Sequence, residues 1–175
     1  VSGVSCESCH GAAGGESGWL NRHQAYHDSR PTPRLQETAE HRSQRIADCE
    51  EAGMIRSENL FDQAQACFRC HVVPHQELIA AGHKMSSATF EYVSWSEGEV
   101  RHNFLLDRKS NAKAPSLWLE NHKGSPENRR RLKFVVGALA QLEAMLRARA
   151  NVSNPVVIPQ LGGGVAAING KLSQI

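Results

Sequence analysis

The sequence predicts a mainly α protein of short helices and long loops, closed by a long amphipathic helix near the C-terminus. Apolar residues recur at helical spacing between residues 126 and 150, and no region is rich in strand-forming residues. The composition is lean for a chain of 175 residues, with 40% hydrophobic and 6% aromatic residues. We therefore expect that the side chains alone do not fill the core and that another apolar group contributes to it.

Two pentapeptides share one pattern, Cys6-Glu7-Ser8-Cys9-His10 and Cys67-Phe68-Arg69-Cys70-His71. The C-x-x-C-H spacing is typical of c-type haem attachment. Each thiol can form a thioether to one vinyl group of a haem, and the histidine that follows gives its imidazole to the iron. Two porphyrins would supply the missing apolar bulk. We expect two covalently bound haem c groups, around which the helices and loops wrap, held by Cys6, Cys9 and His10 and by Cys67, Cys70 and His71.

Other interpretations of the cysteines are weaker. A structural zinc site can use two C-x-x-C pairs, but these usually lie about 15–20 residues apart in compact modules. Cys9 and Cys67 are much further apart, and zinc gives no reason for a histidine after both pairs. A disulfide framework is not needed in a chain of this length. Cys49 is expected to be a bystander in a polar helix, with pairing to another chain as the alternative.

The net charge and the hydropathy of the chain exclude some classes of binding partner. The 20 Lys plus Arg nearly balance the 18 Asp plus Glu, which argues against a nucleic-acid binder. No stretch is long and apolar enough to span a bilayer, and Val1-Ser2-Gly3-Val4 is not a signal peptide. Covalent haem attachment takes place outside the cytoplasm, so we expect an exported, periplasmic or extracellular protein. The first motif begins at Cys6, which suggests a missing N-terminal portion.

In the first half of the chain, residues 11–18 have loop composition, and Trp19 is expected to pack on the first haem. Residues 34–52 predict a polar, solvent-facing helix that Gly53 ends. A short helix from Glu58 to Ala66, with Ser57 as its N-cap, should deliver the second motif.

In the second half, Pro74 should start two helical turns that Gly82 closes. Residues 84–104 carry aromatic residues expected to line a haem, and residues 115–121 could form one short helix.

The strongest local prediction is a helix from Pro126 to about Ala150, with Ser125 as its N-cap. One apolar face is expected to close the core; its residues are Leu132, Val135, Val136, Leu139, Leu142 and Leu146. We assign residues 1–150 to a dihaem cytochrome domain. Residues 151–175, with Pro155, Pro159 and three consecutive glycines, are expected to be an extended tail that could serve as an interaction segment.

Seven of the nine histidines remain after the two motifs, and each iron needs a sixth ligand unless it is kept open for substrate. The loops from His10 to His23 and from His71 to His83 are long enough to pass around a porphyrin edge. His75 lies too close to His71 to cross the same haem and would serve another one, while His102 could serve either iron. The candidate distal ligands are His23, with His27 as its rival, His75, His83 and His102. Met54, Met85 and Met145 are expected to be packing residues.

The motifs resemble one family. Residues 3–11, Gly-Val-Ser-Cys-Glu-Ser-Cys-His-Gly, are similar to the G-V-S-C-E-x-C-H-G pattern of multihaem c-type cytochromes related to the cytochrome c-554 family. The run from Cys67 to His83 resembles the last haem segment of that family, in which paired histidines match His75 and His83. Members usually carry four haems, with the G-V-S-C-E motif third, so the chain resembles the C-terminal, two-haem half. Lys84 stands where relatives often have proline. The resemblance implies electron transfer outside the cytoplasm.

The leading hypothesis is electron transfer through two c-type haems, each with two histidine ligands. The protein would be a redox carrier or a subunit of a larger multihaem complex. Its expected partners are redox proteins and other haem-bearing subunits. One alternative is a haem enzyme whose open iron acts on a small nitrogen or peroxide species. The other is a subunit of a haem-wire assembly, joined through the helix at 34–52, the tail or His75. The sequence leaves redox potentials, oligomeric state and the pairing of histidines with irons open.

Overall fold

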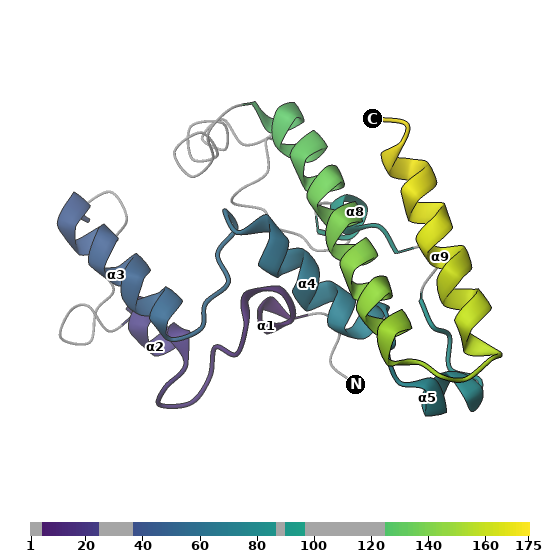
Figure 1. The fold of residues 1–175 in the computed structure, drawn as a ribbon. Coiled ribbons are helices and arrows are strands. Elements are labelled where there is room, and N and C mark those ends of the chain that lie inside the picture. Colours follow the sequence, from purple (N-terminus) through teal and green to yellow (C-terminus); the bar gives the residue numbers. More distant parts are fainter. Residues whose placement is uncertain (1–4, 25–36, 87–89, 97–124) are drawn as a thin grey trace. The chain divides into compact units, whose positions relative to one another are not determined.

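The computed structural model describes residues 5–24, 37–86, 90–96 and 125–175, and these residues form helices and loops without a strand (Figure 1). An isolated bridge joins Val72 and Ser86. The expectation of a mainly α protein is therefore confirmed. The chain divides into two compact units, Val1–Asn59 and Leu60–Ile175, and each is described by itself.

The first unit contains α1 (Cys6–His10), α2 (Trp19–Gln24) and α3 (Ala39–Glu51). Helix α3 begins after Thr38, whose side chain accepts a hydrogen bond from the His41 backbone, and the chain turns away at Gly53 with a φ of 89°. The expected polar helix is thus present. The buried core that α2 and α3 share is small, consisting of Ala13, Trp19 and Cys49 with Ala52 and Met54 partly buried beside them.

A buried ion cluster fixes the start of α3. Glu37, whose side chain is only 4% exposed, accepts hydrogen bonds from Arg45 Nε at 2.6 Å and from His41 Nδ1 at 2.8 Å. The Arg45 guanidinium and then the His41 imidazole lower the pKa of Glu37 to about 2. His41, which the polar sequence around it places at the surface, is instead half-buried in this cluster.

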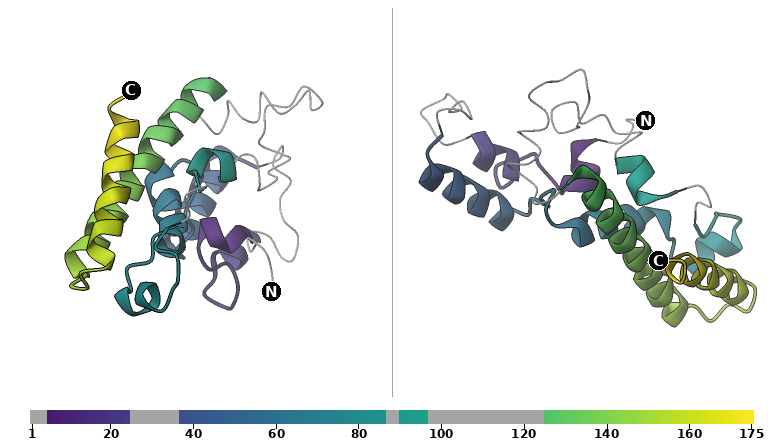
Figure 2. Two further views of the ribbon diagram at one scale, coloured as in Figure 1. Left: turned by 90° about the vertical axis from the view of Figure 1, so that its right-hand side faces the viewer. Right: turned by 90° about the horizontal axis from the view of Figure 1, so that it is seen from above.

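The second unit contains α4 (Leu60–His71), α5 (Gln76–Ala80), α6 (Tyr92–Ser94), α8 (Pro126–Asn151) and α9 (Val157–Leu172). Helices α4, α6 and α9 pack against α8, and α5 contacts α9 (Figure 2). Helix α4 begins at Leu60, so the predicted start at Glu58 with Ser57 as N-cap is wrong. The helix continues past the predicted end at Ala66 through the second motif, because Leu60, Ala64 and Phe68 form a buried face along it. Helix α5 is followed by Gly82 at a φ of 96°, as predicted.

Helix α8 is confirmed with its cap, since Ser125 Oγ accepts a hydrogen bond from the Asn128 backbone at 3.2 Å. The predicted core-facing side of this helix is wrong for three of its six residues, whereas Leu142 is partly buried against the core as predicted. Leu132, Leu139 and Leu146 are 51%, 46% and 50% exposed. The buried side carries small residues and one methionine, namely Gly137, Ala138, Ala140, Met145 and Ala148. Small residues face the core because neighbouring elements approach closely: a Cβ on Gly137 would lie 2.9 Å from Cβ of Tyr92.

The expectation that residues 151–175 form an extended tail is also wrong, because most of them form α9, which runs beside α8 in the opposite direction (Figure 1). Pro159 is tolerated because it lies in the first turn of α9, where backbone N–H groups have no helical partner. The three consecutive glycines lie within α9 without breaking it. One of them, Gly164, allows close packing, because a Cβ there would lie only 2.7 Å from Met145 Sδ. The signal missed is the spacing of the buried Val157, Leu161 and Ile168.

Candidate haem attachment sites

The first C-x-x-C-H pentapeptide coincides with α1, a helical segment of five residues. Residues three and four positions apart lie on one side of a helix, so Cys6, Cys9 and His10 share a face. Cys6 is exposed, whereas Cys9 and His10 are half-buried. Glu7 secures the loop that follows, because its Oε1 accepts hydrogen bonds from the backbone of Ala13 at 2.6 Å and Gly14 at 3.2 Å.

His10 is tied to the segment after α3 by two hydrogen bonds. Its carbonyl accepts from the Ile55 backbone at 3.0 Å, and its ring Nδ1 lies 2.6 Å from the Ile55 carbonyl oxygen. A carbonyl oxygen can only accept, so Nδ1 carries the proton and donates it. In the neutral imidazole the lone pair then lies on Nε2, which is the arrangement that a metal-ligating histidine needs.

A tight turn follows the first motif. Gly11 has a φ of 80°, and a Cβ at this position would lie 2.6 Å from the Gly53 carbonyl oxygen. The carbonyl of Gly11 accepts a hydrogen bond from Trp19 Nε1 at 2.9 Å. Trp19 is 8% exposed and belongs to the small core beside Cys49, whose thiol pKa is raised by burial. The turn after His10 is therefore held by Trp19 and lies close to the Gly53 carbonyl.

The second pentapeptide forms the C-terminal end of α4, so Cys67, Cys70 and His71 also share one face. Cys67 and His71 are half-buried and Cys70 is exposed. The chain beyond the motif is held in place, because the Val73 backbone donates a hydrogen bond to the Met85 carbonyl at 2.8 Å. Met85 and Met145 lie in the core as packing residues, as predicted.

Aromatic residues surround His71. Its ring stacks on Phe90 with centroids 3.8 Å apart and an interplanar angle of 15°, and the Trp95 ring lies 6.1 Å away. Burial lowers the pKa of His71, which favours the neutral form that can donate a lone pair to iron. Tyr92, expected to line a haem, is 2% exposed and instead packs inward, donating from its hydroxyl to Gln63 Oε1 at 2.9 Å.

Two predicted distal ligands flank α5. His75 is the N-cap residue of this helix and its side chain is exposed. His83 follows Gly82, is exposed, and has its Nδ1 2.7 Å from the Lys84 carbonyl oxygen. The acceptor is again a carbonyl, so Nδ1 carries the proton and Nε2 keeps the lone pair. His83 thus has the same tautomer as His10, although nothing in the described residues brings it to His71.

The remaining predicted ligands are less well placed. His23 lies in the last turn of α2, and partial burial followed by the nearby charge of Arg45 lowers its pKa, although much of its surface is exposed. His102 and the rival His27 lie outside the described residues, as do Phe104 and the expected helix at 115–121. The structure therefore describes five of the predicted iron ligands, namely His10 and His23 in the first unit and His71, His75 and His83 in the second.

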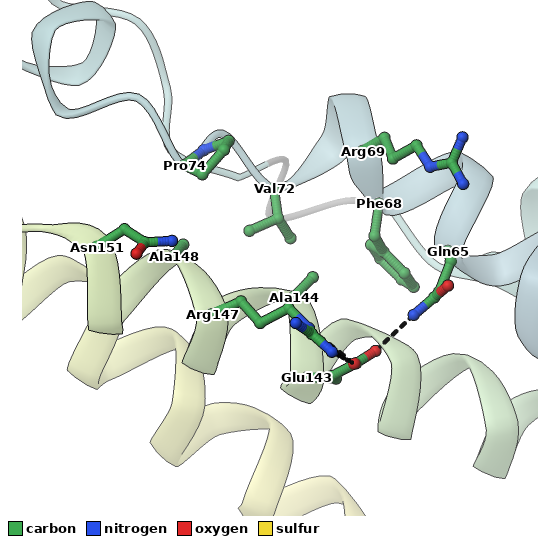
Figure 3. A pocket seen from close by; sticks show the side chains of 10 residues that line it. All are labelled: Gln65, Phe68, Arg69, Val72, Pro74, Glu143, Ala144, Arg147, Ala148 and Asn151. Atoms are coloured by element: carbon green, nitrogen blue, oxygen red, sulfur yellow. Dashed lines mark hydrogen bonds and ion pairs between the residues drawn. The ribbon is translucent and has the colours of Figure 1, made fainter.

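An open pocket of about 350 Å³ lies between α4 and α8 (Figure 3). Gln65, Phe68 and Arg69 line it from α4, and Glu143 accepts hydrogen bonds from Gln65 at 2.6 Å and Arg147 at 2.8 Å. At 100° per residue, these α4 positions lie on a different side of the helix from Cys67, Cys70 and His71. The pocket is therefore separate from the second motif.

The residues of the first unit fit a covalently attached haem on two grounds. The Nδ1 of His10 is fixed as a donor to Ile55, and the described residues of the unit bury few apolar side chains of their own. Among the described residues, no group of three or more His, Cys, Asp or Glu could hold a metal ion, so the zinc alternative gains no site. Haem does not require such a group, because the cysteines bind the porphyrin and one histidine of each motif binds the iron.

Sequence reasoning missed two contributors to this site. Ile55 acts through its backbone carbonyl, which no side-chain pattern identifies, and Gly53 acts through its carbonyl, for which Gly11 leaves room by lacking a Cβ. A positive-φ glycine directly after a helix is a usual signal for Gly53, but its contact partner depends on the fold.

Within the described parts of the chain, none of the helices has the length and apolar character needed to cross a bilayer. Comparison with protein families found no matching family model, and neither the curated proteins nor the solved structures gave a match.

Proposed function

We propose that the chain carries two c-type haems, attached at Cys6 and Cys9 and at Cys67 and Cys70, and that it transfers electrons between redox partner proteins. The observation that carries this proposal is the first motif. Both thiols and the imidazole share a face of α1, and the hydrogen bond from His10 Nδ1 to Ile55 leaves Nε2 as the basic nitrogen.

When bound, a c-type haem supplies an iron that cycles between ferrous and ferric and so passes one electron at a time. The chain's own residues prepare the site. The Ile55 carbonyl orients the His10 ring and fixes its tautomer, as hydrogen-bonded partners of metal-ligating histidines do. Phe90 and Trp95 keep water from one side of His71, which favours its neutral form.

The proposed sixth ligands are histidines of this chain or of a partner, with His83 supported by its tautomer and His23 by its lowered pKa. The proposed location is the periplasm or the extracellular space, where haem is attached to exported chains. The resemblance to multihaem cytochromes supports both statements, and other haem-bearing subunits are the proposed source of any ligand that this chain lacks.

The test is to count covalent haem after production in a host that attaches haem to exported proteins. The intact mass of the denatured full chain should include two haems. The Cys6→Ala/Cys9→Ala and Cys67→Ala/Cys70→Ala variants should each retain one, and the Cys49→Ala control should retain both. A wild-type chain without covalent haem would refute the proposal.

A further inference from the structure

A stripe of three leucines is exposed along the second unit. Leu132, Leu139 and Leu146, here called the leucine stripe, lie on the side of α8 opposite its buried alanines. About half of each residue's surface is open, at 51%, 46% and 50%. A surface helix normally turns its large apolar residues to the core, whereas these three leucines face outward. An exposed row of large apolar residues indicates an interaction surface.

The spacing of the stripe fits another helix. The leucines are seven residues apart, which places them within about 40° of one another around the helix axis. The half-buried Val135 and Leu142 fall between them, so the five residues occupy the a and d positions of a heptad pattern. A helix that lies on a lipid surface needs a wider apolar face than this narrow seam.

The charges around the leucine stripe indicate that its partner is acidic. Helix α8 carries six Lys or Arg and two Glu, a net charge of +4. Arg130 and Arg131 are exposed near its N-terminal end, and Arg147 and Arg149 near its C-terminal end. The ion pairs Arg131–Glu127 and Arg147–Glu143 are at the surface, where such pairs neutralise little. Because both ends are cationic, a second copy would bring like charges together in either orientation.

We propose that the leucine stripe is the docking site for an acidic amphipathic helix of a different protein. This helix would present apolar residues at heptad spacing to the leucines and carboxylates to the arginines at both ends. The surface is independent of the haem motifs, so its partner would bind whether or not the proposed function holds.

The experiment uses the full chain and two designed helical peptides of about four heptads, a length sufficient for a stable seam. Both peptides have leucine at a and d; one has glutamate at e and g, and the other has lysine. By fluorescence anisotropy, the glutamate peptide should bind at least about tenfold more tightly than the lysine peptide, and added salt should weaken it. Leu139→Gln should weaken that binding about tenfold, while Leu78→Gln, an exposed leucine on α5, should leave it unchanged.

Four results would overturn the proposal. Equal binding of the two peptides would remove the charge argument. If the wild-type chain forms a dimer that Leu139→Gln dissociates, the leucine stripe binds a second copy of the chain. If the wild-type chain binds anionic lipid vesicles and Leu139→Gln does not, the leucine stripe binds a membrane surface. A thermal midpoint lowered by more than about 5 °C in Leu139→Gln, but not in Leu78→Gln, would show that the chain itself covers the stripe.

Discussion

The two units carry the same pentapeptide but have very different cores. In the first unit the motif forms a short helix beside a core of Ala13, Trp19 and Cys49. In the second it ends α4, which packs within a larger core that includes α8 and α9. A small unit whose described residues bury so few apolar side chains usually needs a further source of stability. If the proposed haems are bound, we expect the first unit to depend on its haem more than the second unit does.

The largest expected effect comes from removing the attachment cysteines of each motif. Cys6→Ala/Cys9→Ala should lower hydrogen-exchange protection across residues 37–55 by at least about a hundredfold, because the first unit would lose the apolar contacts of the proposed haem. In Cys67→Ala/Cys70→Ala, α8 and α9 should keep their protection. Equal losses of protection in the two units would contradict the comparison.

The contact between Gly11 and Gly53 tests how tightly the first motif is held. Gly11→Ala should destabilise the first unit by about 2 kcal/mol or more, since it adds strain at a φ of 80° and a clash with the Gly53 carbonyl. Gly15→Ala is the matched control, with a φ of 79° and no atom within 4 Å of the added Cβ. It should cost only about 1 kcal/mol. Exchange measured on residues of α3 reports both values, and equal costs would rule out the close contact.

Acid should weaken the first unit before the second. The pKa of Glu37 is about 2 in the folded chain, against 4.5 for an ordinary glutamate, because Arg45 and His41 stabilise its charge. This stability is present above pH 4.5 and is lost as the pH falls toward 2, with an amount on the order of 2 kcal/mol. Glu37→Gln should remove this pH dependence, whereas Glu40→Gln, exposed in the first turn of α3, should retain it. Unfolding of α3 followed at several pH values checks both variants.

The smallest expected effect concerns the packing of α9 on α8. Gly163→Ala should stabilise the second unit by roughly 0.5–1 kcal/mol, because alanine is the better helix former and its Cβ meets nothing within 4 Å. Gly164→Ala should lack this gain, because its Cβ would press against the buried Met145 side chain. Denaturant unfolding gives the two values. A Gly164→Ala variant as stable as Gly163→Ala would show that the helices do not approach so closely.

Local signals in the sequence predicted where helices begin and end better than they predicted which side of a helix is buried. Ser125, Gly53 and Gly82 marked element ends correctly, because capping depends on a few neighbouring residues. The exposed leucines of α8 were predicted as core because periodicity identifies an apolar side but not what covers it. The three consecutive glycines of α9 suggested a loop because glycine is a poor helix former, and the contact between Gly164 and Met145 of another helix cannot be seen from the local sequence. The two motifs could be identified from spacing alone, whereas the Ile55 carbonyl that orients His10 depends on the fold.

The central claim is that two c-type haems transfer electrons through this chain. An electron paramagnetic resonance spectrum of the oxidised full-length protein, with iron measured on the same sample, tests it most directly. We expect two irons per chain, both low-spin ferric, because each would have two histidine ligands. A high-spin signal from one iron would indicate an open coordination position and contradict simple electron transfer. A chain without iron would contradict the whole account.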